Sequence, residues 1–269
     1  MTPRGDRVGF VPRILALPAI VGLALLGLPL VALVLRVEWS TIWSDITSPE
    51  AVSALWLSLA TGIIATGVCV VLGVPLALLI ARSGARPAAV LRALVTVPLV
   101  LPPMVGGVAM LFLFGRTSWL GGMLAEWGIR IPFTTTAVVL AQTFVALPFL
   151  VLALEGSLRS TGVGYEQAAA ALGAGRWTIL GRVTLPLAAP GLIAGIVLCF
   201  ARAIGEFGAT ALFAGNAPGV TQTMPLAIYT AFNGAGVSQG SAVALSLLLL
   251  VTAIAVLLLV RAWRPEAQR

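Results

Sequence analysis

The chain has 269 residues, of which 59% are hydrophobic and only 9% are charged, and its mean hydropathy is +1.08. This composition excludes an ordinary soluble domain and indicates an all-α protein with several membrane-spanning helices. All sixteen basic residues are arginines, and they lie between apolar runs rather than on one polar face. We therefore expect the net charge of +7 to reflect membrane topology and not binding to nucleic acid.

Two residue types that the chain lacks limit its chemistry. Without lysine it cannot hold ATP in a P-loop, and without histidine it lacks the commonest general base and metal ligand. We expect no catalytic residue, no metal site and no cofactor bound by this chain, which is then not an enzyme by itself. Cys69 and Cys199 stand alone in apolar segments and are expected to be small buried hydrophobes; the alternative is a disulfide or a metal pair.

A helix needs roughly 20 apolar residues to cross a membrane, and the chain offers six such stretches. Arg4, Arg7 and Arg13 precede the first stretch, as in a secretory signal. Its apolar run of about 22 residues is longer than a signal core, however, so we expect a retained helix. The six predicted spans are residues 14–35, 54–81, 89–114, 134–154, 187–213 and 241–261.

The placement of the arginines predicts the orientation. With the N-terminus inside, twelve arginines fall on the cytoplasmic side and three on the outer side, as the positive-inside rule requires. We expect a multi-pass protein of the cell (inner) membrane with both termini in the cytoplasm. The outer set is Arg36, Arg116 and Arg130, and the cytoplasmic set is Arg4, Arg7, Arg13, Arg82, Arg86, Arg92, Arg159, Arg176, Arg182, Arg261, Arg264 and Arg269.

The third span contains prolines and glycines where a plain anchor helix would have leucine. Pro102 and Pro103 remove backbone donors, which hydrocarbon tolerates only where protein or a water-filled cavity covers the break. We interpret this span as a broken helix that lines a pathway or gate, with Pro102, Pro103 and Gly106 at the break. The alternative is a kink buried between neighbouring helices.

A polar segment, YEQAAAALGAGRWTILGRVTLP (165–186), separates the fourth and fifth spans. Residues 165–172 are strong helix formers, Gly173 suits a left-handed cap, and residues 177–183 predict a second short helix. Leu185 and Pro186 are expected to end that helix and to redirect the chain to the membrane. The pattern predicts a compact cytoplasmic projection that a partner protein binds; the alternative is an amphipathic loop at the headgroups.

The fifth span carries two charges. Arg202 and Glu206 are four residues apart, so they lie on one helix face and can pair. Charges at this depth usually face a bundle interior or an aqueous path. Arg202 either meets an anionic substrate or forms a structural or gating pair with Glu206, and Gly208 permits close packing or a local break. In the outer loop that follows, residues 224–232 predict a short interfacial or re-entrant helix.

Residues 165–186 resemble the EAA loop of ABC-importer permeases, whose pattern is Glu-Ala-Ala, Gly, Ile and Leu-Pro at fixed spacing. Gln167 and Val183 depart from that pattern, and Glu166 stands one residue before the expected glutamate. The resemblance implies a coupling helix that docks into a separate ATPase subunit. The coupling residues implied are Glu166, Gln167, Ala168, Ala169, Gly173, Arg176, Val183, Leu185 and Pro186.

The run from FARAIGEFGAT (200–210) through TQTMPLAIY (221–229) resembles the molybdate branch of these permeases. Sulfate and thiosulfate permeases share the Gly-Glu-aromatic-Gly element and are the alternative. The resemblance implies the type I ABC importer permease (MetI-like) fold, with an N-terminal part (1–53), a permease core (54–261, coupling loop 155–186) and a tail (262–269). The partners implied are two ATPase subunits with ATP and Mg²⁺, an extracytoplasmic oxyanion-binding protein, a second identical permease chain and membrane lipid.

Two other classes of protein provide alternatives to an importer subunit. A stand-alone secondary transporter would need ionisable groups near the membrane midplane and an internal repeat, and the sequence shows no clear repeat and one charged pair. A membrane scaffold or sensor would have no use for a coupling loop.

Overall fold

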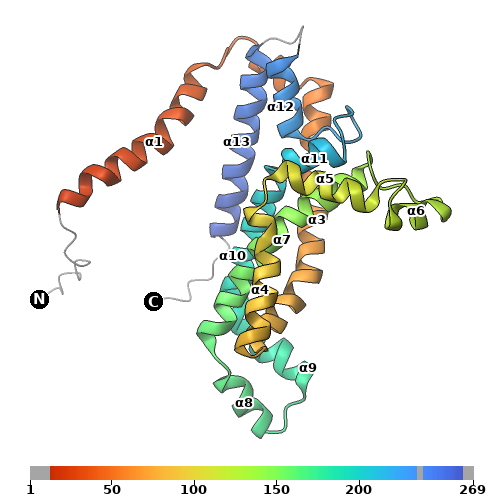
Figure 1. Ribbon diagram of the computed structural model, residues 1–269. Helices are drawn as coiled ribbons and strands as arrows, with labels where there is room; N and C mark the ends of the chain where they lie inside the picture. Colours follow the sequence, from red (N-terminus) through yellow and green to blue (C-terminus); the bar gives the residue numbers. More distant parts are fainter. Residues whose placement is uncertain (1–12, 235–238, 263–269) are drawn as a thin grey trace, which may run out of the picture.

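The computed structural model describes residues 13–234 and 239–262, and every regular element within these ranges is helical (Figure 1). Residues 1–12 and 263–269, which carry part of the charge argument for cytoplasmic termini, lie outside the described residues. The elements are η1 (Arg13–Leu15), α1 (Ala16–Leu35), α2 (Ile42–Ile46), α3 (Pro49–Arg82), α4 (Ala85–Val100), α5 (Pro103–Phe114), α6 (Trp119–Glu126), α7 (Thr135–Thr161), α8 (Gly164–Ala171), α9 (Arg176–Ile179), the π-helical turn η2 (Leu180–Thr184), α10 (Leu185–Ile204), α11 (Gly208–Phe213), α12 (Met224–Asn233) and α13 (Gln239–Ala262).

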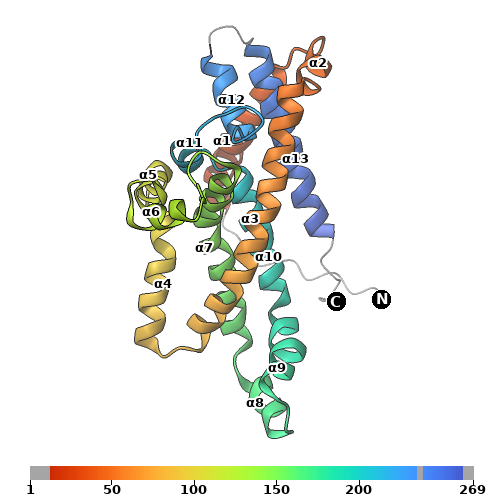
Figure 2. The same cartoon turned by 90° about the vertical axis from the view of Figure 1, so that its right-hand side faces the viewer.

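The centre of the bundle is α7, which packs against both α3 and α10 (Figures 1 and 2). Small side chains make this close packing possible, because they let helix backbones approach one another. On α10, a Cβ atom added at Gly191 would lie 2.2 Å from the Cβ of Ser157 on α7. On α3, the buried face is built mainly from small residues spaced three or four apart: Ala51, Ala54, Ser58, Thr61, Ala65, Cys69, Gly73 and Ala77.

Cys69 and Cys199 belong to that packed interior. Both are fully buried, and they share one cluster with Ala65, Ala146 and Leu150 between α3, α7 and α10. Neither thiol is in a disulfide. The cysteines therefore fill core space, as the sequence predicted.

The first helix stands apart from this bundle. None of the residues of α1 is buried, and Figure 1 shows α1 inclined away from the remaining helices. Its apolar surface is therefore left for lipid or another chain to cover.

Four helical stretches of the described residues are long and apolar enough to cross a membrane: α1, α3, α7 and the continuous stretch Arg176–Ile204. Together, α4 and α5 could provide a fifth span. The described apolar part of α13, Gly240–Ala255, is shorter than the others. A multi-pass helical membrane protein is thereby confirmed, whereas the predicted number of six spans is not.

Two of the predicted spans are broken. The third, predicted over 89–114, bends by 110° between α4 and α5, where Pro102 caps the helix that Pro103 begins. The fifth, predicted over 187–213, is interrupted at residues 205–207 between α10 and α11. The expected break in the third span is confirmed, and the glycine-rich end of the fifth span also forms one.

Pro186 does not end a helix, contrary to the prediction. The helix that starts at Arg176 continues without interruption to Ile204, and Pro186 lies in the first turn of α10. The π-helical turn η2 precedes it, and there the amide of Leu185 donates to the carbonyl of Leu180, five residues earlier. This wider turn shifts the hydrogen-bond register just before the proline, which lacks a donor.

The fourth span is longer than the sequence indicated, because α7 continues seven residues beyond the predicted end at 154. It stops at Gly162, whose φ of +71° favours glycine. The short helix expected at 224–232 is present as α12, and the backbone amide of Met224 at its start donates to Ser58 Oγ of α3 at 2.7 Å.

Candidate functional site

The connection between α7 and α10 projects from one end of the bundle and carries α8 and α9 (Figure 2). Gly173 ends α8 with a φ of +84°, a conformation that side chains disfavour. The amide of Gly173 donates to Ala170 and the amide of Ala174 donates to Ala169, which is the Schellman pattern of a helix C-terminus. The predicted first helix and its left-handed cap are confirmed, whereas the second predicted short helix is the beginning of the long helix Arg176–Ile204.

Large apolar side chains are exposed on this projection. Leu172 is 90% exposed and Trp177 is 85% exposed, and Tyr165 is also exposed. Large apolar groups exposed on a projection are typical of a contact surface for another protein.

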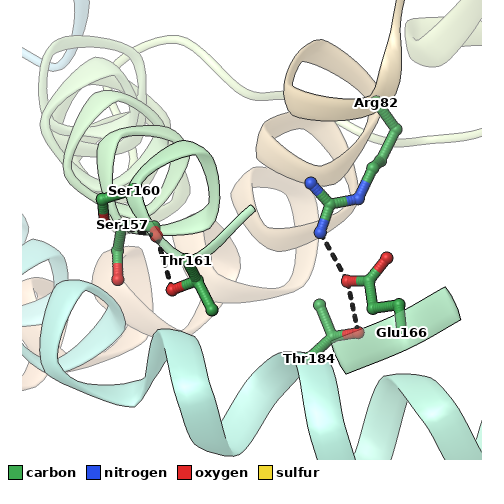
Figure 3. A network of polar contacts seen from close by, with 6 residues as sticks. All are labelled: Arg82, Ser157, Ser160, Thr161, Glu166 and Thr184. Atoms are coloured by element: carbon green, nitrogen blue, oxygen red, sulfur yellow. Dashed lines mark hydrogen bonds and ion pairs between the residues drawn. The ribbon is translucent and has the colours of Figure 1, made fainter. Parts of the chain in front are cut away.

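Glu166 connects the projection to the bundle (Figure 3). Its carboxylate accepts hydrogen bonds from the Arg82 guanidinium at the end of α3 and from Thr184 Oγ1 of η2, the latter at 2.8 Å. Glu166 of α8 thus contacts both the end of α3 and η2, the turn that leads into α10. Arg82 was not predicted as a partner, since 84 residues separate it from Glu166.

The same contacts set the charge of Glu166. Partial burial raises the pKa of its carboxyl group, but the hydrogen bonds from Arg82 and Thr184 and the charge of Arg82 outweigh burial and lower the pKa below its ordinary value. The side chain is therefore ionised at neutral pH.

The other predicted coupling residues lie in three places. Gln167 and Arg176 line a 480 Å³ pocket beside Glu166 and Arg82, between the projection and α3. Ala168 and Ala169 lie on α8, with Ala168 exposed. Val183, Leu185 and Pro186 follow on the helix that leads into the bundle.

A second charged cluster, which the sequence analysis missed, lies where α4 meets α7. The carboxylate of Glu155 is only 4% exposed and accepts from Arg92 of α4 at 2.5 and 3.3 Å and from Arg159 at 2.8 Å. The spacing of Glu155 and Arg159, four residues apart, could have indicated that α7 continues past 154.

Two of the predicted pathway residues, Pro103 and Gly208, meet where α11 crosses the start of α5. A Cβ atom at Gly208 would lie 3.0 Å from the Cβ of Pro103, and one at Gly106 would lie 2.9 Å from the ring of Phe144. Pro102 precedes Pro103 and is exposed. The two broken spans therefore contact each other beside their breaks.

Arg202 and Glu206 lie at the break between α10 and α11. The guanidinium of Arg202 contacts Glu206 Oε2 at 2.6 Å, and the backbone amide of Ala209 donates to Oε1 at 2.7 Å. Glu206 is 1% exposed, whereas the Arg202 side chain is 27% exposed. Both carboxylate oxygens are therefore occupied by groups of this chain.

Known proteins resemble this chain over most of its length. Residues 73–268 match the family described as "Binding-protein-dependent transport system inner membrane component". The "Molybdenum transport system permease protein ModB" of Mycobacterium tuberculosis is 52% identical over 254 residues, which is 94% of this chain and 95% of that protein. The "Sulfate transport system permease protein CysT" of Escherichia coli is 34% identical, over 82% of this chain and 80% of its own length.

A solved structure shows the same fold. A bacterial ABC transporter involved in the import of the acidic polysaccharide alginate contains a chain that matches with a TM-score of 0.71, over 96% of both chains. Sequence identity to it is 16%.

We predict that Glu166→Gln weakens the attachment of the projection at neutral pH, by roughly 0.2–1 kcal/mol, the range of exposed ion pairs. The lowered pKa of Glu166 means that the contact stabilises at pH values above the ordinary carboxyl value of about 4.3 and is lost as pH falls through the lowered value. Amide hydrogen exchange of α8 should therefore converge for the wild type and the variant as the pH falls below the lowered pKa of Glu166.

The matched control is Arg176→Gln, which alters another residue of the same pocket that has no ion pair among the described residues. It should keep the wild-type pH dependence. If the protection of α8 against exchange fell as steeply with pH in Glu166→Gln as in the wild type, a group other than Glu166 would be responsible.

Proposed function

The chain belongs to the family of binding-protein-dependent transport system inner membrane components, and we propose that it is the permease subunit of an ATP-driven importer that carries molybdate into the cytoplasm. The relative that is 52% identical over 94% of the chain carries the substrate assignment. The sulfate permease is the less similar relative, at 34% identity.

ATP and Mg²⁺ belong to a separate subunit in this proposal, because the chain contains no lysine for a P-loop. The projection is the part of the chain that two ATPase subunits, one for each permease chain, would contact. Its exposed Leu172 and Trp177 support a largely apolar contact. Glu166 is paired with Arg82 of the same chain, so it positions the projection.

Motion at the projection can reach the outer half of the bundle through two connections. One is the contact of Glu166 with α3, and the other is the continuous helix from Arg176 to Ile204. That helix ends beside Arg202, Glu206 and the crossing of α11 with α5. We assign the gate to this crossing, with Pro103 and Gly208 at the contact, Pro102 before it and Gly106 facing Phe144 of α7.

The Arg202–Glu206 pair is assigned a structural and gating role. Both oxygens of Glu206 are used within the chain, and the pair holds α11 against the end of α10. A transported anion would then meet few fixed charges, which suits a low-affinity route fed by an extracytoplasmic oxyanion-binding protein.

A second copy of the chain completes the proposed pathway. The unburied α1 supports this assembly, since its apolar surface is free to contact another permease chain as well as lipid. The excess of arginine at the end that bears the projection supports cytoplasmic termini.

We expect molybdate, delivered by its binding protein, to stimulate ATP hydrolysis by the reconstituted complex of permease and ATPase, and sulfate not to. Hydrolysis is measured in proteoliposomes with each oxyanion at equal concentration. Stimulation by sulfate alone would support an importer whose substrate is sulfate instead of molybdate. No stimulation by either, in an assembled complex, would contradict the molybdate and sulfate assignments together.

Gly173→Leu should reduce ATPase binding or uncouple hydrolysis from uptake. A Cβ atom at Gly173 has no neighbour within 4 Å, so the cost arises from the φ of +84°, roughly 1–2 kcal/mol for a residue with a side chain. Gly175→Leu is the matched control, because Gly175 also has free space but a φ of −71°. Equal uptake by both variants would remove the requirement for the left-handed cap.

Arg202→Gln should destabilise the purified chain by about 3 kcal/mol, since it leaves the buried Glu206 unpaired. The double variant Arg202→Gln/Glu206→Gln should recover most of the thermal stability and measurable molybdate uptake. A double variant that is stable and assembled but transports nothing would instead place Arg202 in contact with the substrate.

A further inference from the structure

We propose that a pocket lined by Arg116 and Arg130 binds a tetrahedral oxyanion, either the phosphate of an anionic lipid or the free anion on its way to the gate. The pocket lies between the end of α5, α6 and the segment that precedes α7, and its volume is 210 Å³. It is distinct from the Arg202–Glu206 pair, none of whose residues lines it. The inference depends on the proposed function only for the identity of the free anion.

The pocket is built by α6 folding back onto the end of α5. A Cβ atom at Gly121 would lie 2.1 Å from the carbonyl oxygen of Gly115, so only glycine allows this approach. Ser118 fixes the turn: its hydroxyl donates to the carbonyl of Leu113 at 2.6 Å and accepts from the amide of Gly121 at 3.0 Å. These contacts hold Arg116 within the turn.

The opposite wall contains a strained residue. Phe133 has a φ of +62°, a conformation that is rare and strained for a bulky side chain.

A contact with α11 stabilises the strained conformation of Phe133: its backbone amide donates to the carbonyl of Phe213 at 3.2 Å. Phe114, another lining residue, packs on the ring of Phe213 with centroids 5.9 Å apart. Two walls of the pocket are therefore fixed to the helix that begins at the gate.

The charge of the pocket is uncompensated. Neither Arg116 nor Arg130 has an ion pair within the described residues, and no carboxylate lines the pocket. Arg82, Arg92 and Arg202, by contrast, each contact a glutamate. Guanidinium groups recognise oxyanions through paired N–H donors. The volume lies below the roughly 300 Å³ at which pockets for drug-sized ligands begin, which suits a phosphate or molybdate group.

Both sources of the anion fit the surroundings. Trp119 begins α6 and Trp127 directly follows it, and the two are 78% and 79% exposed; tryptophan is enriched at the headgroup level of membranes. The pocket also lies on the outer side of the topology inferred from the arginines, where a binding protein releases its cargo. The experiment therefore separates a lipid phosphate from the free anion.

The test uses the intact complex of permease and ATPase in nanodiscs of phosphatidylcholine, with or without phosphatidylglycerol, and with or without inorganic molybdate. Arginine modification by phenylglyoxal is mapped on the wild type by mass spectrometry. Protection of Arg116 and Arg130 by phosphatidylglycerol alone identifies a lipid site, and protection by molybdate in phosphatidylcholine identifies a site for the free anion. Arg36, the other arginine on the outer side, should stay unprotected.

A variant gives the second measurement. Arg116→Gln/Arg130→Gln should weaken retention of the protecting anion by roughly tenfold or more, the loss expected for a charge-assisted hydrogen bond, and Arg36→Gln should not. Arg116→Lys/Arg130→Lys keeps the charge and should retain part of the binding. If neither anion protects the wild type, the inference is overturned, whether or not molybdate is the transported substrate.

Discussion

The carboxylate of Glu155 accepts from Arg92 of α4 and from Arg159 of its own helix, and this contact determines where α4 lies against the central helix. Because Glu155 is almost fully buried, separating it from Arg92 would leave Arg159 as its remaining ion-pair partner among the described residues, which favours the packed position of α4. With the middle of α4 fixed to α7, the bend at Pro102 can direct α5 across the bundle toward α11. The gate assigned above thus depends on an ion pair in the middle of α4.

Two further carboxylates join separate helices of this chain. Glu166 joins the projection to α3 and η2, and Glu206 joins α10 to the start of α11. Between these two carboxylates runs one helix of 29 residues, about 43 Å long at 1.5 Å per residue. A helix of that length moves as a unit except where its hydrogen-bond register changes, and η2 is such a place. In the proposed transporter, movement of an ATPase subunit would therefore rotate or translate this helix, and η2 is the place where the helix could bend.

The sequence predicted the structure correctly where the backbone of single residues determines it. Gly173 predicted its left-handed cap, and Pro102 with Pro103 predicted the break in the third span, since both effects arise from the backbone of single residues. The positions of helix ends were less predictable. The fourth span ends seven residues beyond the predicted 154, because Glu155 is buried within α7 and its partner Arg92 is 63 residues away in the sequence.

At Pro186 the sequence predicted a helix end where the helix in fact continues. A proline usually marks a helix boundary, but here the preceding π-helical turn accommodates it in the first turn of α10. Partners such as Arg82 for Glu166 depend on tertiary packing, so one sequence alone gave no spacing from which to derive them. The same holds for the pocket at Arg116 and Arg130, whose two arginines come together only because α6 folds back at Gly121.

The isolation of α1 has a consequence for how the bundle folds. The interior of α3, α7 and α10 contains none of the side chains of α1. The core can therefore close without a contribution from α1, so the packing of the single chain does not provide the cover of this helix. In the proposed transporter, lipid and a second permease chain would provide that cover.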